Sequence, residues 1–298
     1  MLPVTASGSP SRRLPVDDVW HLIGAGSIGT LAASRLLAAG FDVRVISRHG
    51  QPAQRRLYWP DGRQRAVTLS AAADEPIRRL LVAVKAGDTR QALQPLLPRL
   101  AVHAEILRLQ NGMGSLHDVA LPETVRVLHL VTTDGAWRSA VDIHVVAENT
   151  TLIGGGGNAP PDWLTRLLPH WPGLQWCQDI ERAQWQKLAV NAVINPLTAV
   201  YRCRNGELLD GGEREQRMAL LAAEVDTVLS ACYPDWPMDT LQRSRDIARQ
   251  TAANTSSMLA DVLAGRETEI RFINGYLLAE AQRKSLSLPA HEALTCQL

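Results

Sequence analysis

The sequence of 298 residues has no apolar run that approaches the roughly 20 residues needed to cross a bilayer. Its net charge of only +1 gives no reason to expect nucleic acid or a membrane surface as a partner. Residues 1–17 lack the apolar segment of a signal peptide, so we expect a disordered lead-in there. We therefore expect neither a membrane nor a nucleic acid as a partner.

The chain also lacks a cysteine pattern that could bind metal. Its cysteines are widely spaced and form no C-x-x-C pair or histidine-associated cluster. They are Cys177, Cys203, Cys232 and Cys296. We therefore expect no metal site, and reduced thiols as in a cytoplasmic protein. Apolar residues are plentiful: at 46% hydrophobic and 20% charged, the chain can bury a sizeable core.

A glycine-rich turn follows the first apolar run of the sequence. It stands between the strand-like segment 19–23 and the helical segment 30–39, and it reads Gly24-Ala25-Gly26-Ser27-Ile28-Gly29. In this context the glycines supply a tight turn, close approach of a pyrophosphate to the backbone, and a helix N-terminus that attracts phosphate. The six residues are therefore predicted to bind a dinucleotide. The alternative is a glycine turn needed only for packing the helix on the strand.

No carboxylate stands where NAD-dependent enzymes bind the ribose 2′-hydroxyl. That position lies about 20 residues after the glycine turn, at the end of the second strand, which here ends in Ser47-Arg48-His49. The planar guanidinium of Arg48 could pair with a 2′-phosphate, which favours NADP over NAD. Asp42 is the only nearby acid, and it stands at the wrong end of the strand. The alternative is that Arg48 is an ordinary surface arginine.

Strand and helix signals alternate in the first part of the chain and give way to helix in the second. Further strands are predicted at residues 80–84, 104–109, 125–131 and 143–146, with a helix at 88–97 and a flexible connection at 154–161. From Ile180 onward the apolar period is helical. The sequence thus predicts an α/β protein with two domains. A Rossmann-type, doubly wound, mainly parallel sheet is expected at 18–179, where the glycine turn would bind NADP, and an all-helical domain at 180–298, which contains the candidate ligand residues described next.

A polar stripe interrupts the aliphatic helix that opens the second domain. Lys187, Asn191 and Asn195 are spaced at four residues, so they share one helical face. Burying a lysine without a partner costs free energy, so a lysine on this helix is expected to have a specific role. One interpretation is a cationic proton donor with two amides that hold a polar ligand. The other is a lysine that extends to solvent while the asparagines cap a kink at Pro196.

Seven motifs together resemble the ketopantoate reductase (2-dehydropantoate 2-reductase) family, and the resemblance runs from about residue 18 to residue 289. They lie at 24–29, 84–86, 110–114, 185–199, 204–208, 256–261 and 268–275. The resemblance implies an NADPH-dependent reduction of 2-dehydropantoate, a 2-oxo acid, to pantoate in pantothenate biosynthesis. It also implies an active site in the cleft between the two domains.

The resemblance assigns the general acid to Lys187, which would protonate the C2 ketone oxygen as hydride arrives from the nicotinamide. The chemistry agrees, because a developing alkoxide needs positive charge and a proton nearby. For the substrate's hydroxyl and carboxylate, the resemblance implies contacts from Asn191, Asn195, Asn205 and Ser257.

For the cofactor, the resemblance implies contacts from Lys85, Asn111, Gly135 and Glu269. The first two follow predicted strands, where open α/β sheets bind ligands. Glu269 would also help to position Lys187, unless it is only a surface partner of Arg271.

Two positions depart from the family pattern. Asp134 stands in a segment, residues 133–136, that usually reads like Thr-His-Gly-Ala, and it would bring an acidic side chain close to the cofactor. His291 stands where an asparagine is common. Neither departure touches Lys187 or Glu269.

Two other functions remain open at the level of sequence. The pair of Lys187 and Asn191 also resembles that of 3-hydroxy-acid dehydrogenases, so a related enzyme could act on another 2-oxo or 3-hydroxy acid. A non-catalytic NADP-binding protein is the other alternative, although such a protein has no need of a proton donor. The sequence does not distinguish a monomer from a homodimer.

Overall fold

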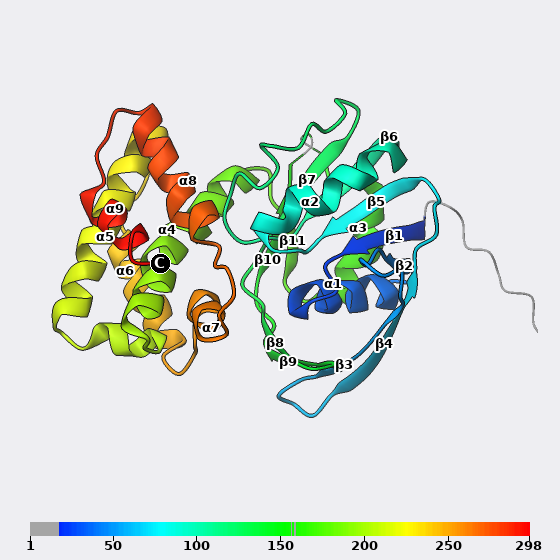
Figure 1. Cartoon of the computed structure of the whole chain (residues 1–298), viewed down its shortest axis with the longest axis horizontal. Helices are drawn as coiled ribbons and strands as arrows, with labels where there is room; N and C mark the ends of the chain where they lie inside the picture. Colours follow the sequence, from blue (N-terminus) through cyan, green and yellow to red (C-terminus); the bar gives the residue numbers. More distant parts are fainter. Residues whose placement is uncertain (1–17, 156, 158) are drawn as a thin grey trace, which may run out of the picture.

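The computed structural model describes residues 18–155, 157 and 159–298. A large sheet with its helices forms one side of the molecule, and a bundle of helices forms the other (Figure 1). The predicted lead-in at residues 1–17 lies outside the described residues, as do Gly156 and Asn158 of the predicted flexible connection.

Eleven strands form one sheet in the described part of the chain. Their order across the sheet is β11-β10-β7-β6-β5-β1-β2-β4-β3-β9-β8. Their bounds are β1 Val19–Ile23, β2 Asp42–Val45, β3 Ala53–Tyr58, β4 Gln64–Ala71, β5 Ile77–Val82, β6 Leu100–Arg108, β7 Arg126–Thr132, β8 Gly135–Ser139, β9 Asp142–Ala147, β10 Thr151–Gly154 and β11 Leu174–Trp176.

The central strands β2, β1, β5, β6 and β7 run parallel to one another. Their registers align Leu22 with Val45 and Leu81, so the strands end at one common edge. The segments that follow these five strands therefore emerge side by side. They carry the glycine turn, Arg48, Lys85, Asn111 and Asp134, which is how a parallel sheet gathers a ligand site at its carboxyl edge.

The helices of the sheet region are short apart from the first one. They are α1 Ser27–Ala38, η2 Ala86–Asp88, α2 Thr89–Leu93, η3 Gln94–Arg99, α3 Asp162–Leu167 and η4 Leu168–His170. The helix predicted at 88–97 is thus only partly α-helical, because Pro95 and Pro98 cannot continue the hydrogen-bond ladder.

The helical region begins directly after the last strand. It contains α4 Ile180–Tyr201, η5 Asn205–Leu209, α5 Glu213–Cys232, α6 Thr240–Gln250, α7 Ser257–Leu263, α8 Ile270–Arg283 and α9 Pro289–Thr295. The side chain of Asp179 caps the start of α4 by accepting a hydrogen bond from the Arg182 amide at 3.1 Å. The predicted fold class, an α/β sheet followed by a helical region, is confirmed.

Helix α4 is the central helix of the bundle, and most of its surface is buried. Pro196 has no N–H, so the carbonyl of Ala192 lacks its usual partner within the helix. Asn274 of α8 replaces it, because its Nδ2 donates to the Ala192 carbonyl at 2.8 Å. The gap in the helical ladder is therefore filled from a neighbouring helix, between the turns that bear Asn191 and Asn195.

The remaining general predictions concern cysteines, metals and membranes. All four cysteines are free. Within residues 18–298, apart from 156 and 158, no group of three or more His, Cys, Asp or Glu side chains could hold a metal ion. No helix in the same residues is long and apolar enough to cross a bilayer.

Candidate active site

The glycines of the turn after β1 serve two different purposes. Gly24 has φ +93°, and a Cβ there would lie 2.4 Å from the carbonyl carbon of Ala83. A Cβ on Gly29 would lie 2.1 Å from the carbonyl oxygen of Gly24. A Cβ on Gly26, in contrast, would have no protein atom within 4 Å. Packing therefore explains Gly24 and Gly29, whereas the open space beside Gly26 suits the approach of a ligand to the backbone.

The N-terminus of α1 is open to an anion. Gly26 is its N-cap residue, no side chain caps the helix, and the first turn contains no acidic residue. The free N–H groups of the first turn, together with the helix dipole, favour a bound phosphate. This geometry fits the pyrophosphate of a dinucleotide.

Arg48 lies exposed just beyond β2 and forms no hydrogen bond or ion pair with the described residues. The nearby acid, Asp42, is already engaged, since Arg44 donates to its carboxylate at 2.8 Å. Arg44 also pairs with Glu75 at 3.0 Å. The structure thus leaves the Arg48 guanidinium accessible beside the glycine turn, as a contact to a 2′-phosphate requires.

The Lys187 ammonium lies at the junction of the helical region and the sheet. Its Nζ donates to Oδ1 of Asn111 at 2.7 Å and to the carbonyl oxygen of Thr132 at 2.8 Å. The alternative in which Lys187 extends to solvent is wrong, because its ammonium is enclosed by protein even though part of the side chain is accessible. An ammonium has three N–H donors, so one remains for a ligand.

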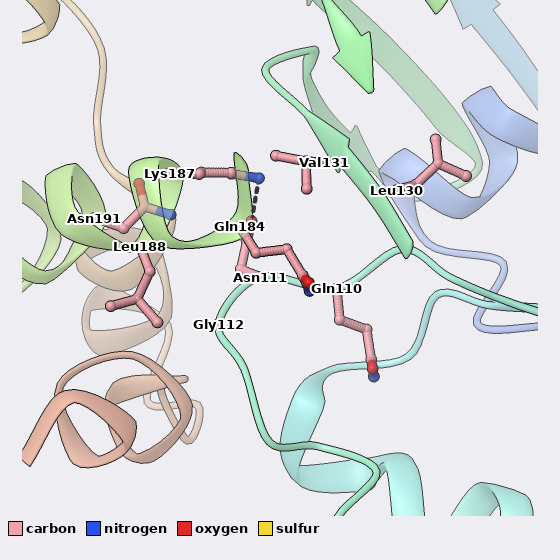
Figure 2. A pocket seen from close by; sticks show the side chains of 9 residues that line it. All are labelled: Gln110, Asn111, Gly112, Leu130, Val131, Gln184, Lys187, Leu188 and Asn191. Carbon is pink, nitrogen blue, oxygen red and sulfur yellow. Dashed lines mark hydrogen bonds between the residues drawn. The ribbon is translucent and has the colours of Figure 1, made fainter. Parts of the chain in front are cut away.

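A small pocket opens beside this ammonium, with Asn191 on the same side of α4 as Lys187 (Figure 2). The pocket draws on loop, strand and helix, and its lining residues are Gln110, Asn111, Gly112, Leu130, Val131, Gln184, Lys187, Leu188 and Asn191. The amide of Asn191 makes no hydrogen bond within the described part of the chain and is therefore available to a ligand.

Burial lowers the pKa of Lys187 from 10.5 to about 8. The loss of hydration disfavours the charged form, and the nearby Arg108 cation acts in the same direction. Glu269 and Asp134 oppose it, since their carboxylates favour the ammonium. The result is an amine that is mostly protonated at neutral pH and yet releases its proton far more easily than a free lysine.

Glu269 acts on Lys187 through Asn111. Its Oε1 accepts from the Ala86 amide at 3.1 Å, and its Oε2 accepts from Nδ2 of Asn111 at 3.4 Å. Oδ1 of Asn111 in turn accepts from Lys187, as the dashed line in Figure 2 shows. Among the described residues no hydrogen bond or ion pair joins Glu269 to Arg271, so the surface-pair alternative is wrong.

Lys85, a predicted cofactor residue, and the loop after β6 also join the two regions. Lys85 forms an ion pair with Asp261 at 2.7 Å and donates to the carbonyl of Glu267 at 2.9 Å. The amide of Met113 donates to the carbonyl of Phe272 at 2.8 Å. Gly112, at φ +71°, permits this approach, because a Cβ there would lie 2.3 Å from the same carbonyl oxygen.

The remaining predicted substrate residues lie on α4 or in segments that follow it in the helical region. Asn195 is nearly buried on α4, and Ser257 is the exposed first residue of α7. Thr198, one turn beyond Asn195, donates to Ser256 at 2.7 Å, which ties the start of α7 to α4. Asn205 is buried at the start of η5 and donates to Oγ1 of Thr251 at 2.8 Å. Their contacts with a substrate stay a prediction.

The two departures from the family pattern have structural explanations. The side chain of Asp134 is only 2% exposed and pairs with Arg35 of α1 at 2.7 Å. Gly135 follows as the first residue of β8, where a Cβ would lie 3.0 Å from Cγ2 of Val146. His291 is buried against Glu224 at 2.8 Å, in the contact between α5 and α9. The carboxylate of Asp134 is therefore engaged with Arg35, and its place relative to a cofactor stays a prediction.

Three contributors to the site were not predicted from the sequence. The Thr132 carbonyl is a backbone group, so no residue pattern marks it. Asp261 lies far from its partner Lys85 in the sequence. Arg108, 3% exposed, could have been found, because a charged residue in the aliphatic segment 104–109 asks for an explanation in the same way as Lys187.

The parallel sheet with its glycine turn, joined to a helical bundle that carries a buried lysine, defines a Rossmann-type protein with a C-terminal helical region. The family described as "Ketopantoate reductase PanE/ApbA" matches residues 20–158, and "Ketopantoate reductase PanE/ApbA C terminal" matches residues 179–298. The chain belongs to the ketopantoate reductase family, which confirms the resemblance inferred from its motifs.

Individual relatives agree with this assignment. The chain is 37% identical over 284 residues to a 2-dehydropantoate 2-reductase of Yersinia pestis, covering 92% of this chain and 91% of that protein. The crystal structure of a probable 2-dehydropantoate 2-reductase of Bacillus subtilis superposes with a TM-score of 0.77 at 30% identity, covering 93% of this chain and 97% of the other.

A more distant structure shows how far the fold alone extends. A D-mandelate dehydrogenase with NADH and anilino(oxo)acetate has a TM-score of 0.80 at 17% identity, covering 94% of this chain and 96% of the other. At that identity only the fold is shared. The choice of substrate must therefore be argued from the side chains.

Proposed function

We propose that this chain catalyses the NADPH-dependent reduction of 2-dehydropantoate to pantoate, a step of pantothenate biosynthesis, with Lys187 as the proton donor. The observation that carries the proposal is the ammonium of Lys187, held by Asn111 and Thr132 with one N–H left beside the pocket. A binding module has no use for such a group, whereas a ketone reduction needs both its charge and its proton.

The residues at the carboxyl edge of the sheet would hold the cofactor. The open space beside Gly26 and the uncapped start of α1 suit a pyrophosphate, and Arg48 suits a 2′-phosphate. When bound, the nicotinamide supplies the hydride that adds to C2 of the substrate. This arrangement supports NADPH rather than NADH as the cofactor.

The side chains of the helical region would bind and orient the substrate. Lys187 donates a hydrogen bond from Nζ to the ketone oxygen, and the proton moves to this oxygen as negative charge develops on it. Asn191, Asn195, Asn205 and Ser257 would orient the hydroxyl and carboxylate groups without adding charge of their own. The chain of Glu269 and Asn111 fixes the direction of the Lys187 side chain.

The test is a spectrophotometric assay of NADPH consumption with 2-dehydropantoate and a panel of other 2-oxo acids. We expect the highest kcat/KM with 2-dehydropantoate. A higher value with an aryl or unbranched 2-oxo acid would reassign the substrate but keep the reaction. NADPH binding without turnover of any oxo acid would favour the non-catalytic alternative.

A further inference from the structure

Two buried ions flank Lys187 without touching it. One is Arg108, at the end of β6, and the other is Asp134, in the turn after β7. The side chain of Arg108 has no carboxylate partner among the described residues, and Asp134 is paired with Arg35. Burying a charge costs free energy, so we expect each of these side chains to hold a neighbouring segment in place.

Arg108 fastens the loop that carries Asn111. Its Nη2 donates to the carbonyl of Gly112 at 2.6 Å, and its Nε donates to Oγ of Ser115 at 2.8 Å. Ser115 continues the network by donating to Gln110 at 2.8 Å. The guanidinium thus holds the residues on both sides of Asn111, whose Oδ1 is the first acceptor of the Lys187 ammonium.

Asp134 fastens the turn that carries Thr132. Its own amide donates to Oγ1 of Thr132 at 3.0 Å, while its carboxylate accepts from Arg35 at 2.7 Å and from the Asn149 amide at 2.6 Å. The turn is therefore anchored to α1 and to the chain before β10. The carbonyl of Thr132 is the second acceptor of the Lys187 ammonium.

We infer that Arg108 and Asp134 are positioning residues for the proposed reduction, each fixing one of the two acceptors that orient the Lys187 ammonium. The inference deepens the proposed function and rests on it, because the orientation matters only if Lys187 delivers a proton.

The same two residues influence the charge of Lys187 in opposite senses. The charged groups that act on its ammonium are Glu269 from the start of α8, Arg108 from β6 and Asp134 from the turn after β7. The Arg108 cation lowers the pKa of Lys187, and the Asp134 carboxylate raises it. Removing the first charge should move the titration of Lys187 to higher pH, and removing the second should move it to lower pH.

The test measures this titration directly in the whole protein. The chain contains only Lys85, Lys187 and Lys284 as lysines, so carbon-13 labelling at lysine Cε gives a simple NMR spectrum. Loss of a signal in Lys187→Met assigns the resonance of Lys187. We expect its midpoint to rise in Arg108→Met and to fall in Asp134→Asn. Midpoints that stay unchanged, or that move in the same direction, would overturn the inference.

Matched controls separate these effects from general damage to the packing. Ser115→Ala removes a neutral partner of Arg108 and should leave the Lys187 midpoint unchanged. Glu148→Gln removes the other carboxylate of Arg35, 3.1 Å away, without touching the Thr132 turn, and should leave both the midpoint and kcat unchanged. A midpoint shift in either control as large as in the charge variants would also overturn the inference.

Turnover supplies the second measurement. Arg108→Met and Asp134→Asn should each lower kcat by about ten- to a hundredfold, since small misplacements of a reacting group have effects of that size. If either fails to fold, Arg108→Lys and Asp134→Glu keep the charge and should lower kcat with little change in midpoint. Unchanged kcat in those variants would contradict the positioning role. An inactive wild-type protein with the expected opposite midpoint shifts would instead refute the proposed function alone.

Discussion

The sheet region and the helical region contribute to the site by different means. In the sheet region, the predicted cofactor site depends mainly on backbone shape, with open space at Gly26 and an uncapped helix. In the helical region, the site depends on a desolvated side chain, Lys187, held in a network of hydrogen bonds. Substitutions that add a side chain should therefore impair the cofactor site of the sheet region. Substitutions that remove side-chain atoms should impair the Lys187 site of the helical region.

The largest effect should come from removing atoms in the helical region. Lys187→Ala should lower kcat by about 10²–10⁴-fold, as expected for loss of a general acid, with NADPH affinity nearly unchanged. Because the pKa of Lys187 is about 8, wild-type turnover should fall as pH rises through that value and the ammonium deprotonates. Steady-state kinetics against pH would show this limb, and it should vanish in the variant.

Lys284→Ala is the matched control, since this exposed lysine lies just after α8. It should leave kcat and the alkaline limb as they are. A Lys187→Ala protein with near-normal kcat would show that the network around the ammonium is structural only.

Adding atoms to the sheet region should have the next largest effect. Gly26→Val should reduce dinucleotide affinity by at least about a hundredfold while the protein still folds, because the new side chain meets no protein atom within 4 Å of its Cβ. Gly29→Ala should instead destabilise the fold by about 1–3 kcal/mol, because its Cβ would overlap the Gly24 carbonyl. Calorimetric titration and thermal unfolding distinguish the two; normal NADPH affinity in Gly26→Val would contradict the proposed site.

Arg48 is a predicted contact of the sheet region that depends on a charged side chain rather than on backbone shape. Removing this side chain therefore tests the contrast between the two regions. Arg48→Ala should weaken NADPH binding by about ten- to a hundredfold, the value of a charge-assisted contact, and NADH binding much less. Fluorescence titration with both cofactors would measure the ratio of NADPH to NADH affinity. Arg44→Ala is the control, because it removes a positive charge from the preceding strand, β2, that is already paired with Asp42 and Glu75. Equal losses for both cofactors would refute the assignment of Arg48 to the 2′-phosphate.

The smallest effect should lie in the support of α4 rather than in the site. Asn274→Leu removes the donor to the Ala192 carbonyl and should lower the free energy of unfolding by about 1–3 kcal/mol. In a Pro196→Ala background the new N–H can bond that carbonyl, so the same substitution should have little effect. Urea denaturation of the four proteins forms a double-mutant cycle; equal losses in both backgrounds would mean that Asn274 acts elsewhere.

The features that were predicted from the sequence have local signals. The glycine turn is marked by spacing and flanking segments, and the face of Lys187, Asn191 and Asn195 follows from the helical period. The change from strands to helices near residue 180 is likewise a change of period. Each of these can be recognised within about 15 residues of chain, which is the span over which periodicity can be judged.

The features that were missed depend on partners that are distant in sequence. The hairpin of β3 and β4 was not predicted, because its exposed face carries polar residues and it is completed by β9, far along the chain. Asp134 looked like a group beside the cofactor, yet its partner Arg35 lies 99 residues away. Long-range pairing of this kind leaves no periodic trace, so charged residues inside apolar segments are the best available sign of it.

The Lys85 side chain has two competing roles: its ion pair with Asp261 and its predicted contact with the cofactor. Lys85 is predicted to lie along the cofactor, but in this structure its ammonium belongs to the contact between the two regions. A nucleotide contact that draws Lys85 away from Asp261 would gain its own free energy less the free energy of the ion pair. By thermodynamic reciprocity, a competition of this kind acts both ways: a stronger ion pair weakens nucleotide binding, and a bound nucleotide weakens the ion pair. Residue 85 would then couple occupancy of the cofactor site to the contact between the two regions.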